Sequence, residues 1–246
     1  MTRVVVAANT LFVFLLCIII QPTSGLSSFS VDSSISSKSM ATKAASAAVA
    51  RNVGKLKIDQ TAMLFCDMQE RFRSLIYKGE TVVQTCRYMT SVAAALDIPI
   101  VATQQYTKVF GPTIKDCFAS PEKELSNLPI FEKKKFSMLT DEVENHLQTL
   151  NRNSYIIMGI EAHVCVQQTC LDLLEKGADV HVIVDGVTSQ QVIDRNMALK
   201  RLEQAGAFLT TAQSAAFMLM ESAEHPNFKA VSKLTVEHMK LPNEFN

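Results

Sequence analysis

The stretch TAMLFCDMQ (residues 61–69) opens with an apolar run and turns polar at Asp67. A short apolar run that ends in this way is typical of a buried strand in a parallel sheet. Similar runs follow at Ile98 to Thr103, Ser154 to Gly159 and Val180 to Val184, and patterns with helical spacing separate them. Strands that alternate with helices form βαβ units, so the sequence predicts an α/β fold with a parallel sheet of about six strands.

Three polar side chains lie where predicted strands end or predicted helices begin. Asp67 follows the first run, Lys133 lies in EKKKFS (residues 132–137), and Cys165 closes GIEAHVC (residues 159–165). The carboxyl ends of parallel strands share one edge of the sheet, where ligand sites collect. A carboxylate that takes the thiol proton and a cation that stabilises the thiolate suit hydrolysis by a cysteine nucleophile. The sequence therefore predicts one catalytic site built from these three residues.

Each of the three residues also has a purely structural interpretation. Asp67 at a strand end would cap the following turn. Cys165 would be an inert buried thiol, but its position after a strand and a glycine, at the start of a helix, favours a reactive one. Lys133 and Lys135 lie on the same side of an extended segment, so periodicity does not choose between them.

Composition and charge restrict the class of function. The 246 residues are 48% hydrophobic and 20% charged, which suits a globular protein with a sizeable core. Lys and Arg balance Asp and Glu at 24 each, but from residue 59 on there are 18 basic and 23 acidic residues, a formal charge of −5. Because no clustered basic face is present in the sequence, we expect no nucleic acid partner.

The cysteines do not form a recognisable disulfide or metal framework. They are Cys17, Cys66, Cys86, Cys117, Cys165 and Cys170. The first lies in the N-terminal segment and the others are scattered through a large apolar domain, so we interpret them as free thiols. No CxxC pair or cluster of His and Cys has zinc-like spacing, and we expect no structural metal.

Residues 1–58 are interpreted as a targeting leader ahead of one domain at 59–246. Arg3, the apolar run from Leu11 to Ile20 and the small residues that follow predict a signal peptide at about residues 1–25, with an uncleaved anchor as the alternative. Residues 26–58 are rich in Ser and Ala and carry basic residues, as in a transit peptide or a disordered linker. The leader predicts entry into the secretory pathway and delivery to a plastid or another organelle. A start at Met40 would instead give a mitochondrial or cytoplasmic product.

The segments CDMQE, KxKFSM and GIEAHVC together resemble the isochorismatase-like hydrolase superfamily, most closely the isochorismatase domain-containing proteins of eukaryotes. The resemblance runs from about Thr61 to Lys233. It implies a doubly wound, Rossmann-like sheet with helices on both faces and a catalytic trio of Asp67, Lys133 and Cys165. It also selects Lys133 among the consecutive lysines, because the family places its lysine three residues before the aromatic residue of an aromatic-Ser pair.

The resemblance extends to the backbone beside Cys165. Family members often carry a non-proline cis peptide at the position of Ile160-Glu161, a costly bond that persists only where the surrounding structure holds it. The N–H groups of Glu161 and Cys165 would then form an oxyanion hole. Each such donor contributes a factor of about a hundred or more in rate.

Three further side chains are candidates for substrate binding. Phe72 aligns with an aromatic residue that flanks the substrate in related amidases, and Gln105 and Tyr106 follow the second strand. A core position for Phe72 and ordinary loop polarity for the other two are the alternatives. Nicotinamidases of the superfamily carry metal-binding histidines after this strand, whereas residues 103–106 (TQQY) contain none. We therefore expect no catalytic metal, no other cofactor and no nicotinamide substrate.

The leading interpretation is a metal-independent hydrolase of a small amide or related C–N bond, acting through a thioester on Cys165. A vinyl-ether hydrolase of isochorismatase type, in which Asp67 protonates the substrate, is the first alternative. A non-catalytic binding or scaffold protein is the second. The expected partners are a small-molecule substrate and other copies of the chain in a homo-oligomer, with no membrane association once the leader is removed. The apolar helix predicted at Ala212 to Met220 would help form that oligomer or complete the core.

Overall fold

The computed structural model describes residues 52–245, so almost all of the predicted leader, Met40 included, lies outside the described residues. The sheet has six strands, all paired in parallel, in the order β3-β2-β1-β4-β5-β6. The strands are β1 (Thr61–Cys66), β2 (Ile100–Gln105), β3 (Ile130–Lys133), β4 (Ser154–Gly159), β5 (Asp179–Val187) and β6 (Phe208–Thr210). This arrangement confirms the predicted α/β fold with a doubly wound parallel sheet.

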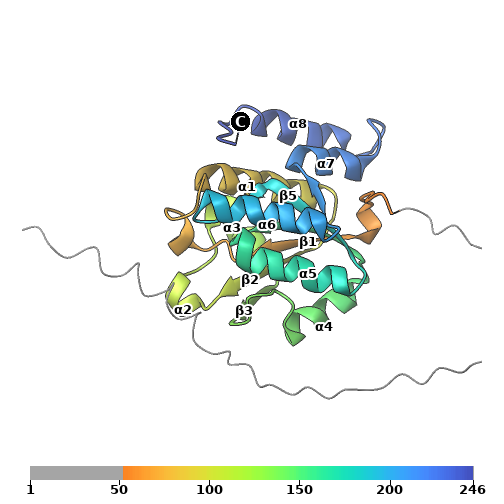
Figure 1. The fold of residues 1–246 in the computed structure, drawn as a ribbon. Coiled ribbons are helices and arrows are strands. Elements are labelled where there is room, and N and C mark those ends of the chain that lie inside the picture. Colours follow the sequence, from red (N-terminus) through yellow and green to blue (C-terminus); the bar gives the residue numbers. More distant parts are fainter. Residues whose placement is uncertain (1–51, 246) are drawn as a thin grey trace, which may run out of the picture. The chain divides into compact units, whose positions relative to one another are not determined.

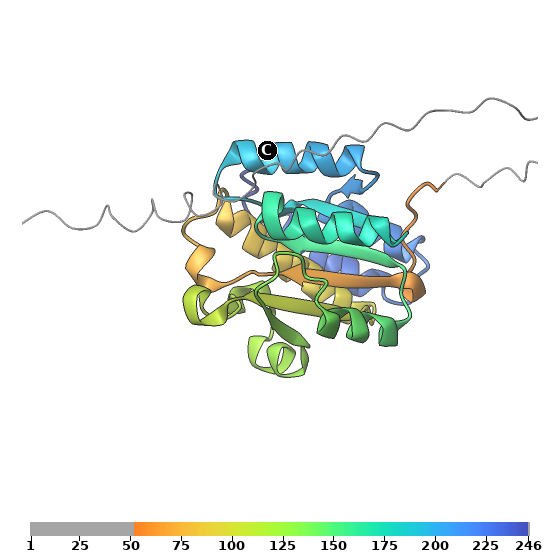
Figure 2. The same ribbon diagram turned by 60° about the horizontal axis from the view of Figure 1, so that its bottom comes forward.

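Helices cover both faces of this sheet. One face, here named the α1 face, packs against α1 (Gly79–Ala95), α7 (Ala212–Met220), α8 (Phe228–His238) and the turn η4 (Lys115–Cys117). The other, the α5 face, packs against α4 (Asp141–Leu150), α5 (Gln167–Glu175) and α6 (Val192–Gln204). Figure 1 shows α7 and α8 on the side of α1, and Figure 2 turns the face with α4 and α5 toward the viewer. The shorter segments are η2 (Ile58–Gln60), η3 (Glu70–Phe72), α2 (Thr107–Phe110), α3 (Pro121–Asn127) and η5 (Ala162–Val166).

Strand β1 lies at the centre of the sheet and is buried along its whole length. Its side chains alternate, so that Met63 and Phe65 enter the core of the α1 face while Leu64 and Cys66 enter the core of the α5 face. A strand covered on both sides requires apolar residues at every position, which explains the unbroken apolar run in the sequence. The alternation also places Cys66 on the face that carries Cys165.

The strand order reverses between β1 and β4. From β1 the chain proceeds outward to β2 and β3, and it then returns to place β4 on the other side of β1. Such a switch point leaves a crevice at the carboxyl ends of the two strands. Gly159, the last residue of β4, has a φ of 125°, and a Cβ there would lie 2.0 Å from the carbonyl oxygen of Cys66. Only glycine permits this close approach of the two strand ends.

Several expected boundaries differ from the structure, including that of β5, which runs over Asp179–Val187 and not only from Val180 to Val184. The second strand begins at Ile100, two residues later than predicted, and continues to Gln105 because residues 102–105 pair with β3. The segment from Gln104 to Pro129, expected to be irregular, contains the short helices α2, η4 and α3. The predicted N-cap of α4 is confirmed, since Thr140 Oγ1 accepts a hydrogen bond from the backbone N–H of Val143.

The ends of the described chain pack against the domain. Leu56 is 1% exposed and belongs to the core of the α1 face. Near the C-terminus, the ring of Phe245 lies 4.2 Å from the Arg195 guanidinium carbon and 6.1 Å from the ring of Tyr77. Within residues 52–245, no helix combines the length and the apolar character needed to cross a membrane.

Candidate active site

Asp67 and Lys133 form a buried ion pair at the carboxyl edge of the sheet. Asp67 follows β1 with a positive φ of 46°, and Lys133 is the last residue of β3. Lys133 Nζ lies 2.7 Å from Asp67 Oδ2, and the residues are 2% and 1% exposed respectively. Thr103 Oγ1 donates to the other carboxylate oxygen, Oδ1, at 2.8 Å. Both oxygens of the buried carboxylate therefore have the partners that burial of a charge requires.

The ammonium group of Lys133 has more acceptors around it than it has protons. Besides Asp67, it donates to Gln105 Oε1 at 2.6 Å and to the backbone carbonyls of Phe136 at 2.8 Å and Lys135 at 3.2 Å. An ammonium group carries three donors, so every proton has a partner. Its two neighbours in the run of lysines are exposed, and the side chain of Lys135 is 53% exposed. Of the three lysines, only Lys133 enters the site.

The charges of this cluster depend on one another. Burial by itself would lower the pKa of Lys133, but negative charge around it, including that of the Asp67 carboxylate to which it donates, outweighs burial and raises the pKa above its ordinary value. Lys133 therefore remains a cation at neutral pH. Burial raises the pKa of the Cys66 thiol well above its usual range, and contact with the Cys165 thiol and the Asp67 charge raise it further. Cys66 is accordingly a neutral thiol rather than a nucleophile.

Cys165 lies beyond the end of β4, in the turn η5 that leads into α5. The helix predicted to begin near His163 opens with this π-helical turn, and the regular α-helix starts at Gln167. Cys165 is 6% exposed, and its carbonyl oxygen accepts a hydrogen bond from Thr169 Oγ1 at 2.6 Å. It interacts electrostatically with Lys133. The thiol predicted as nucleophile thus lies within the same charged cluster.

A second thiol, that of Cys66, neighbours both the carboxylate and Cys165. Cys66 Sγ donates to Asp67 Oδ2 at 3.7 Å, and the neighbouring Cys165 thiol contributes to the raised pKa of Cys66. Cys66 is completely buried. The site therefore contains two adjacent thiols, one carboxylate and one ammonium group.

The backbone around Glu161 has the predicted cis peptide bond at Ile160-Glu161. The carbonyl oxygen of Glu161 accepts from the N–H groups of Val164 and Val166, each at 3.1 Å. Its carboxylate accepts from the backbone N–H and the side-chain amide of Gln190, both at 3.0 Å. Glu161 therefore links the turn after β4 to the segment after β5.

The three predicted substrate-binding residues occupy different environments. Gln105 binds Lys133 through its side-chain carbonyl and donates to the backbone carbonyl of Lys134 at 3.1 Å. Tyr106 is 42% exposed, and its ring lies 5.5 Å from Lys134 Nζ. Phe72 is partly buried and stacks on Phe110 with 4.6 Å between ring centroids. Gln105 is thus part of the charged cluster, whereas Tyr106 faces solvent beside it and Phe72 packs against the core.

Sequence reasoning missed three residues of this cluster: Cys66, Gln69 and Thr103. Gln69 is buried, and its side chain holds both backbone groups of Gln105, at 2.7 Å from the N–H and 3.1 Å from the carbonyl. Thr103 is the direct neighbour of Cys66 in the paired strands. The sequence carries only a weak signal for them, their closeness to a strand-end carboxylate along the chain or on the adjacent strand, because the register that pairs Thr103 with Cys66 comes from the folded sheet.

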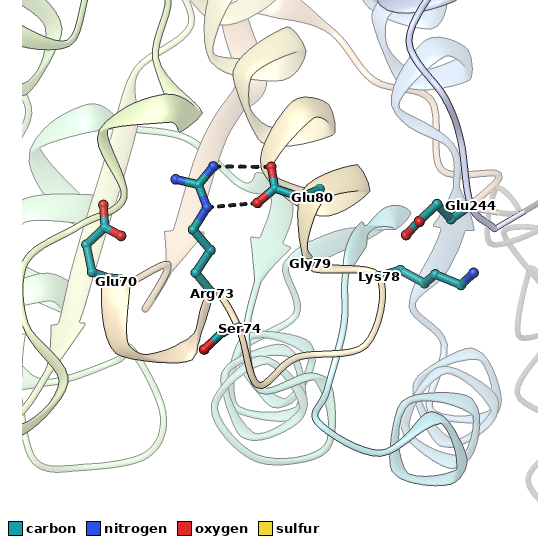
Figure 3. A pocket seen from close by; sticks show the side chains of 7 residues that line it. All are labelled: Glu70, Arg73, Ser74, Lys78, Gly79, Glu80 and Glu244. Carbon is teal, nitrogen blue, oxygen red and sulfur yellow. Dashed lines mark hydrogen bonds and ion pairs between the residues drawn. The ribbon is translucent and has the colours of Figure 1, made fainter.

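A surface pocket of about 550 Å³ opens beside the N-terminus of α1 (Figure 3). Arg73 lines it, with its guanidinium bound to Glu80 at 2.8 Å and to Asp116 at 2.7 Å. No residue of the predicted trio lines this pocket. Within residues 52–245, no three His, Cys, Asp or Glu side chains are grouped as a metal site would require.

Comparison with known proteins places this chain in a family. The family model of the isochorismatase domain matches residues 61–214. The secreted isochorismatase effector Isc1 of Phytophthora sojae is 43% identical over 205 residues, which cover 82% of this chain and 97% of the relative. Isochorismatase domain-containing protein 2 of Xenopus laevis is 40% identical over 188 residues, 76% of this chain and 89% of that protein.

Solved structures agree with this placement. A structure described as the MAR1 ribonuclease of Caenorhabditis elegans is 40% identical and has a TM-score of 0.69, covering 74% of this chain and 92% of that chain. The YcaC gene product of Escherichia coli, described as an octameric hydrolase of unknown specificity, shares the fold at 20% identity with a TM-score of 0.66, covering 78% of this chain and 100% of that one. The chain therefore belongs to the isochorismatase family of hydrolases.

Proposed function

We propose that this chain hydrolyses a small amide or related C–N bond through a thioester on Cys165, without a metal. The observation that carries the proposal is the buried ion pair of Asp67 and Lys133 beside the two thiols. A buried ion pair is a costly arrangement to maintain for stability alone. Next to a thiol, it provides a proton acceptor and a fixed positive charge, which are the requirements of nucleophilic catalysis by cysteine.

The proposed reaction has two halves. Asp67 accepts the proton of Cys165, and the thiolate attacks the substrate carbonyl to form a tetrahedral intermediate. The C–N bond then breaks, and the amine leaves with the proton that Asp67 returns. In the second half, Asp67 takes a proton from water, the resulting hydroxide attacks the thioester, and the acid is released as the Cys165 thiol forms again.

Two groups of donors support the charges that develop in this scheme. Lys133 keeps a positive charge beside the thiolate, because three neighbouring backbone or amide oxygens hold its ammonium group in place. The N–H groups of Glu161 and Cys165 are proposed as the oxyanion hole. Gln105 is proposed to hold Lys133, and Tyr106 and Phe72 are proposed to line the approach to the thiol.

The burial of the site favours a small substrate. Cys165 is 6% exposed, and Asp67 and Lys133 are less exposed still. A polymer such as RNA would have to open the site to bring a phosphodiester to these groups. The relative described as a ribonuclease nevertheless makes RNA a substrate to include in any screen.

Vinyl-ether hydrolysis is the second candidate, and the name of the Phytophthora sojae relative favours it. In that reaction Asp67 would donate a proton to the substrate, and Cys165 would have no covalent role. Asp67 accepts hydrogen bonds from both Lys133 and Thr103, an arrangement that suits a proton acceptor better than a proton donor. We therefore place thioester chemistry first.

The test uses Cys165→Ala beside Cys170→Ala, a buried cysteine one turn further along the same segment. Both variants and wild type are incubated with an activated ester, which transfers its acyl group to a reactive thiol. The intact masses are then measured, and the acylated residue is located by peptide mass spectrometry. They are also screened against small amides, ureides, isochorismate and RNA. We expect the adduct and the amidase activity in wild type and in Cys170→Ala, and neither in Cys165→Ala. Turnover of isochorismate that survives in Cys165→Ala would establish the second candidate instead, and no adduct or turnover in wild type would leave a binding protein.

Location and assembly are also proposed. The leader, together with a relative described as secreted, supports export of this chain through the secretory pathway. N-terminal sequencing of the mature protein distinguishes cleavage near residue 25 from a start at Met40. The octameric relative supports a homo-oligomer, which light scattering of residues 52–246 would measure.

A further inference from the structure

Cys66 has no role in the reaction proposed above, yet it occupies the most central position in the site. Strand alternation points it to the α5 face, where Cys165 also lies. Its sulfur is 3.7 Å from Asp67 Oδ2, and the neighbouring Cys165 thiol contributes to its raised pKa. A nucleophilic thiol, a second thiol and a base are therefore next to one another. This is the arrangement of a redox-active cysteine pair.

We propose that Cys66 is the resolving cysteine of an oxidative modification site, in which a peroxide oxidises Cys165 and Cys66 then closes a disulfide with it. The inference rests on the proposed role of Cys165 as a thiolate nucleophile, because thiolates react with peroxides and neutral thiols do not. Hydrogen peroxide is small enough to enter a site built for a small substrate. The modification would switch the hydrolase off reversibly.

The modification has two steps, oxidation of Cys165 and closure of the disulfide. The Cys165 thiolate attacks one oxygen of hydrogen peroxide, the O–O bond breaks, and hydroxide leaves; the sulfur is oxidised by two electrons to a sulfenic acid and the peroxide is reduced. The Cys66 sulfur then attacks the Cys165 sulfur as Asp67 takes the Cys66 proton, the S–O bond breaks, and Asp67 passes that proton to the departing hydroxyl group, which leaves as water. A thiol reductant returns both cysteines to the reduced state through a mixed disulfide.

Asp67 provides the base for the second step. Because burial raises the pKa of the Cys66 thiol, this thiol does not ionise unaided at neutral pH. Its donation to Asp67 Oδ2 places the proton acceptor in position before the reaction starts. The carboxylate that accepts the proton of Cys165 in hydrolysis would thus accept the proton of Cys66 when Cys165 is oxidised.

A second thiol pair provides an internal control. Cys86 in α1 and Cys117 in η4 are also buried and influence each other's ionisation, but they lie in the core of the α1 face. Burial raises the pKa of Cys117 well above its usual range. A pair without a nucleophilic member should not respond to peroxide, so oxidation should be confined to the site.

The experiment compares wild type, Cys66→Ser, Cys66→Ala and Cys86→Ser. Each protein comprises residues 52–246, and its folding is checked by circular dichroism. Each protein receives a modest excess of hydrogen peroxide, is quenched with an alkylating agent and is mapped by peptide mass spectrometry without reduction. A parallel sample receives the acylating probe to measure the reactivity of Cys165. Dithiothreitol is then added to the oxidised samples.

In wild type and in Cys86→Ser we expect a cross-linked peptide that joins residues 66 and 165, loss of acylation, and full recovery of acylation after dithiothreitol. Both Cys66 variants should instead accumulate sulfinic and sulfonic acid on Cys165, with acylation that dithiothreitol does not restore. Wild type that overoxidises Cys165 without the cross-link, as the Cys66 variants do, would overturn the inference while leaving the proposed function intact. If Cys165 reacts with neither the acylating probe nor peroxide, both proposals fail, and a cross-link without acylation would overturn only the function.

Discussion

Replacement of Lys133 by Met tests whether the buried ion pair organises the site. Methionine fills a similar volume but removes the charge, so Asp67, at 1% exposure, would remain a buried carboxylate with only Thr103 and the Cys66 thiol as donors. Breaking a buried pair from one side costs about 3–5 kcal/mol. This is a large part of the free energy of unfolding of a typical domain, roughly 5–15 kcal/mol. Urea denaturation of residues 52–246 at neutral pH would show the loss as a lower midpoint.

Replacement of the other member of the pair, Asp67→Asn, should lower the free energy of unfolding by less. Lys133 would keep its three oxygen acceptors outside the pair, so we expect a loss of about 1–3 kcal/mol. The double variant leaves neither charge unpaired, and it should therefore be more stable than the sum of the single losses predicts, by about 1–3 kcal/mol. The coupling between the two residues is the quantity measured.

Lys135→Met is the matched control, because Lys135 is two residues away and its side chain is 53% exposed. Loss of a surface charge changes stability by no more than about 0.5 kcal/mol. The reasoning is refuted if Lys133→Met costs no more than this control, or if the losses from Lys133→Met and Asp67→Asn simply add in the double variant.

Three further predictions concern stability. Burial lowers the pKa of His181 from its ordinary 6.5 to about 4, so the folded state favours the neutral ring. The free energy of unfolding should therefore fall by at most about 3 kcal/mol as the pH drops through that range. Urea titrations at successive pH values measure this loss, and His181→Phe should flatten the pH profile. Gly159→Ala should prevent soluble expression, because its Cβ would overlap the Cys66 carbonyl, whereas Gly177→Ala, with open space around it, should cost only about 1 kcal/mol. Thr140→Ala should cost about 1 kcal/mol by removing the N-cap of α4, and a Thr140→Ser variant with an equal loss in thermal denaturation would contradict this.

The sequence predicts the fold well because the sheet is parallel and central. A strand buried on both faces leaves a continuous apolar run, and the runs at 61–66 and 154–159 match the observed strands residue for residue. Edge pairing leaves a weaker signal. Gln104 and Gln105 are polar, and they belong to β2 only because β3 pairs with them, which no local pattern reveals.

The candidate site is only partly visible in the sequence. Asp67, Lys133 and Cys165 are conspicuous because each interrupts or follows an apolar run. Their supporting residues are not conspicuous, since a buried glutamine or threonine is recognised only when the acceptor it holds is known. Thr103 acquires its role from its place in the register, opposite Cys66, and that register comes from the folded sheet.

The ion pair joins residues 66 positions apart in the chain, and it reaches across β2, which lies between the strands β1 and β3 that carry its two members. In the proposed reaction, the Cys165 thiol becomes reactive only when both members of the ion pair are in place. Pulse labelling of the Cys165 thiol during refolding would therefore report when the site forms. Labelling would begin once the strands that carry Asp67 and Lys133 are aligned in the sheet.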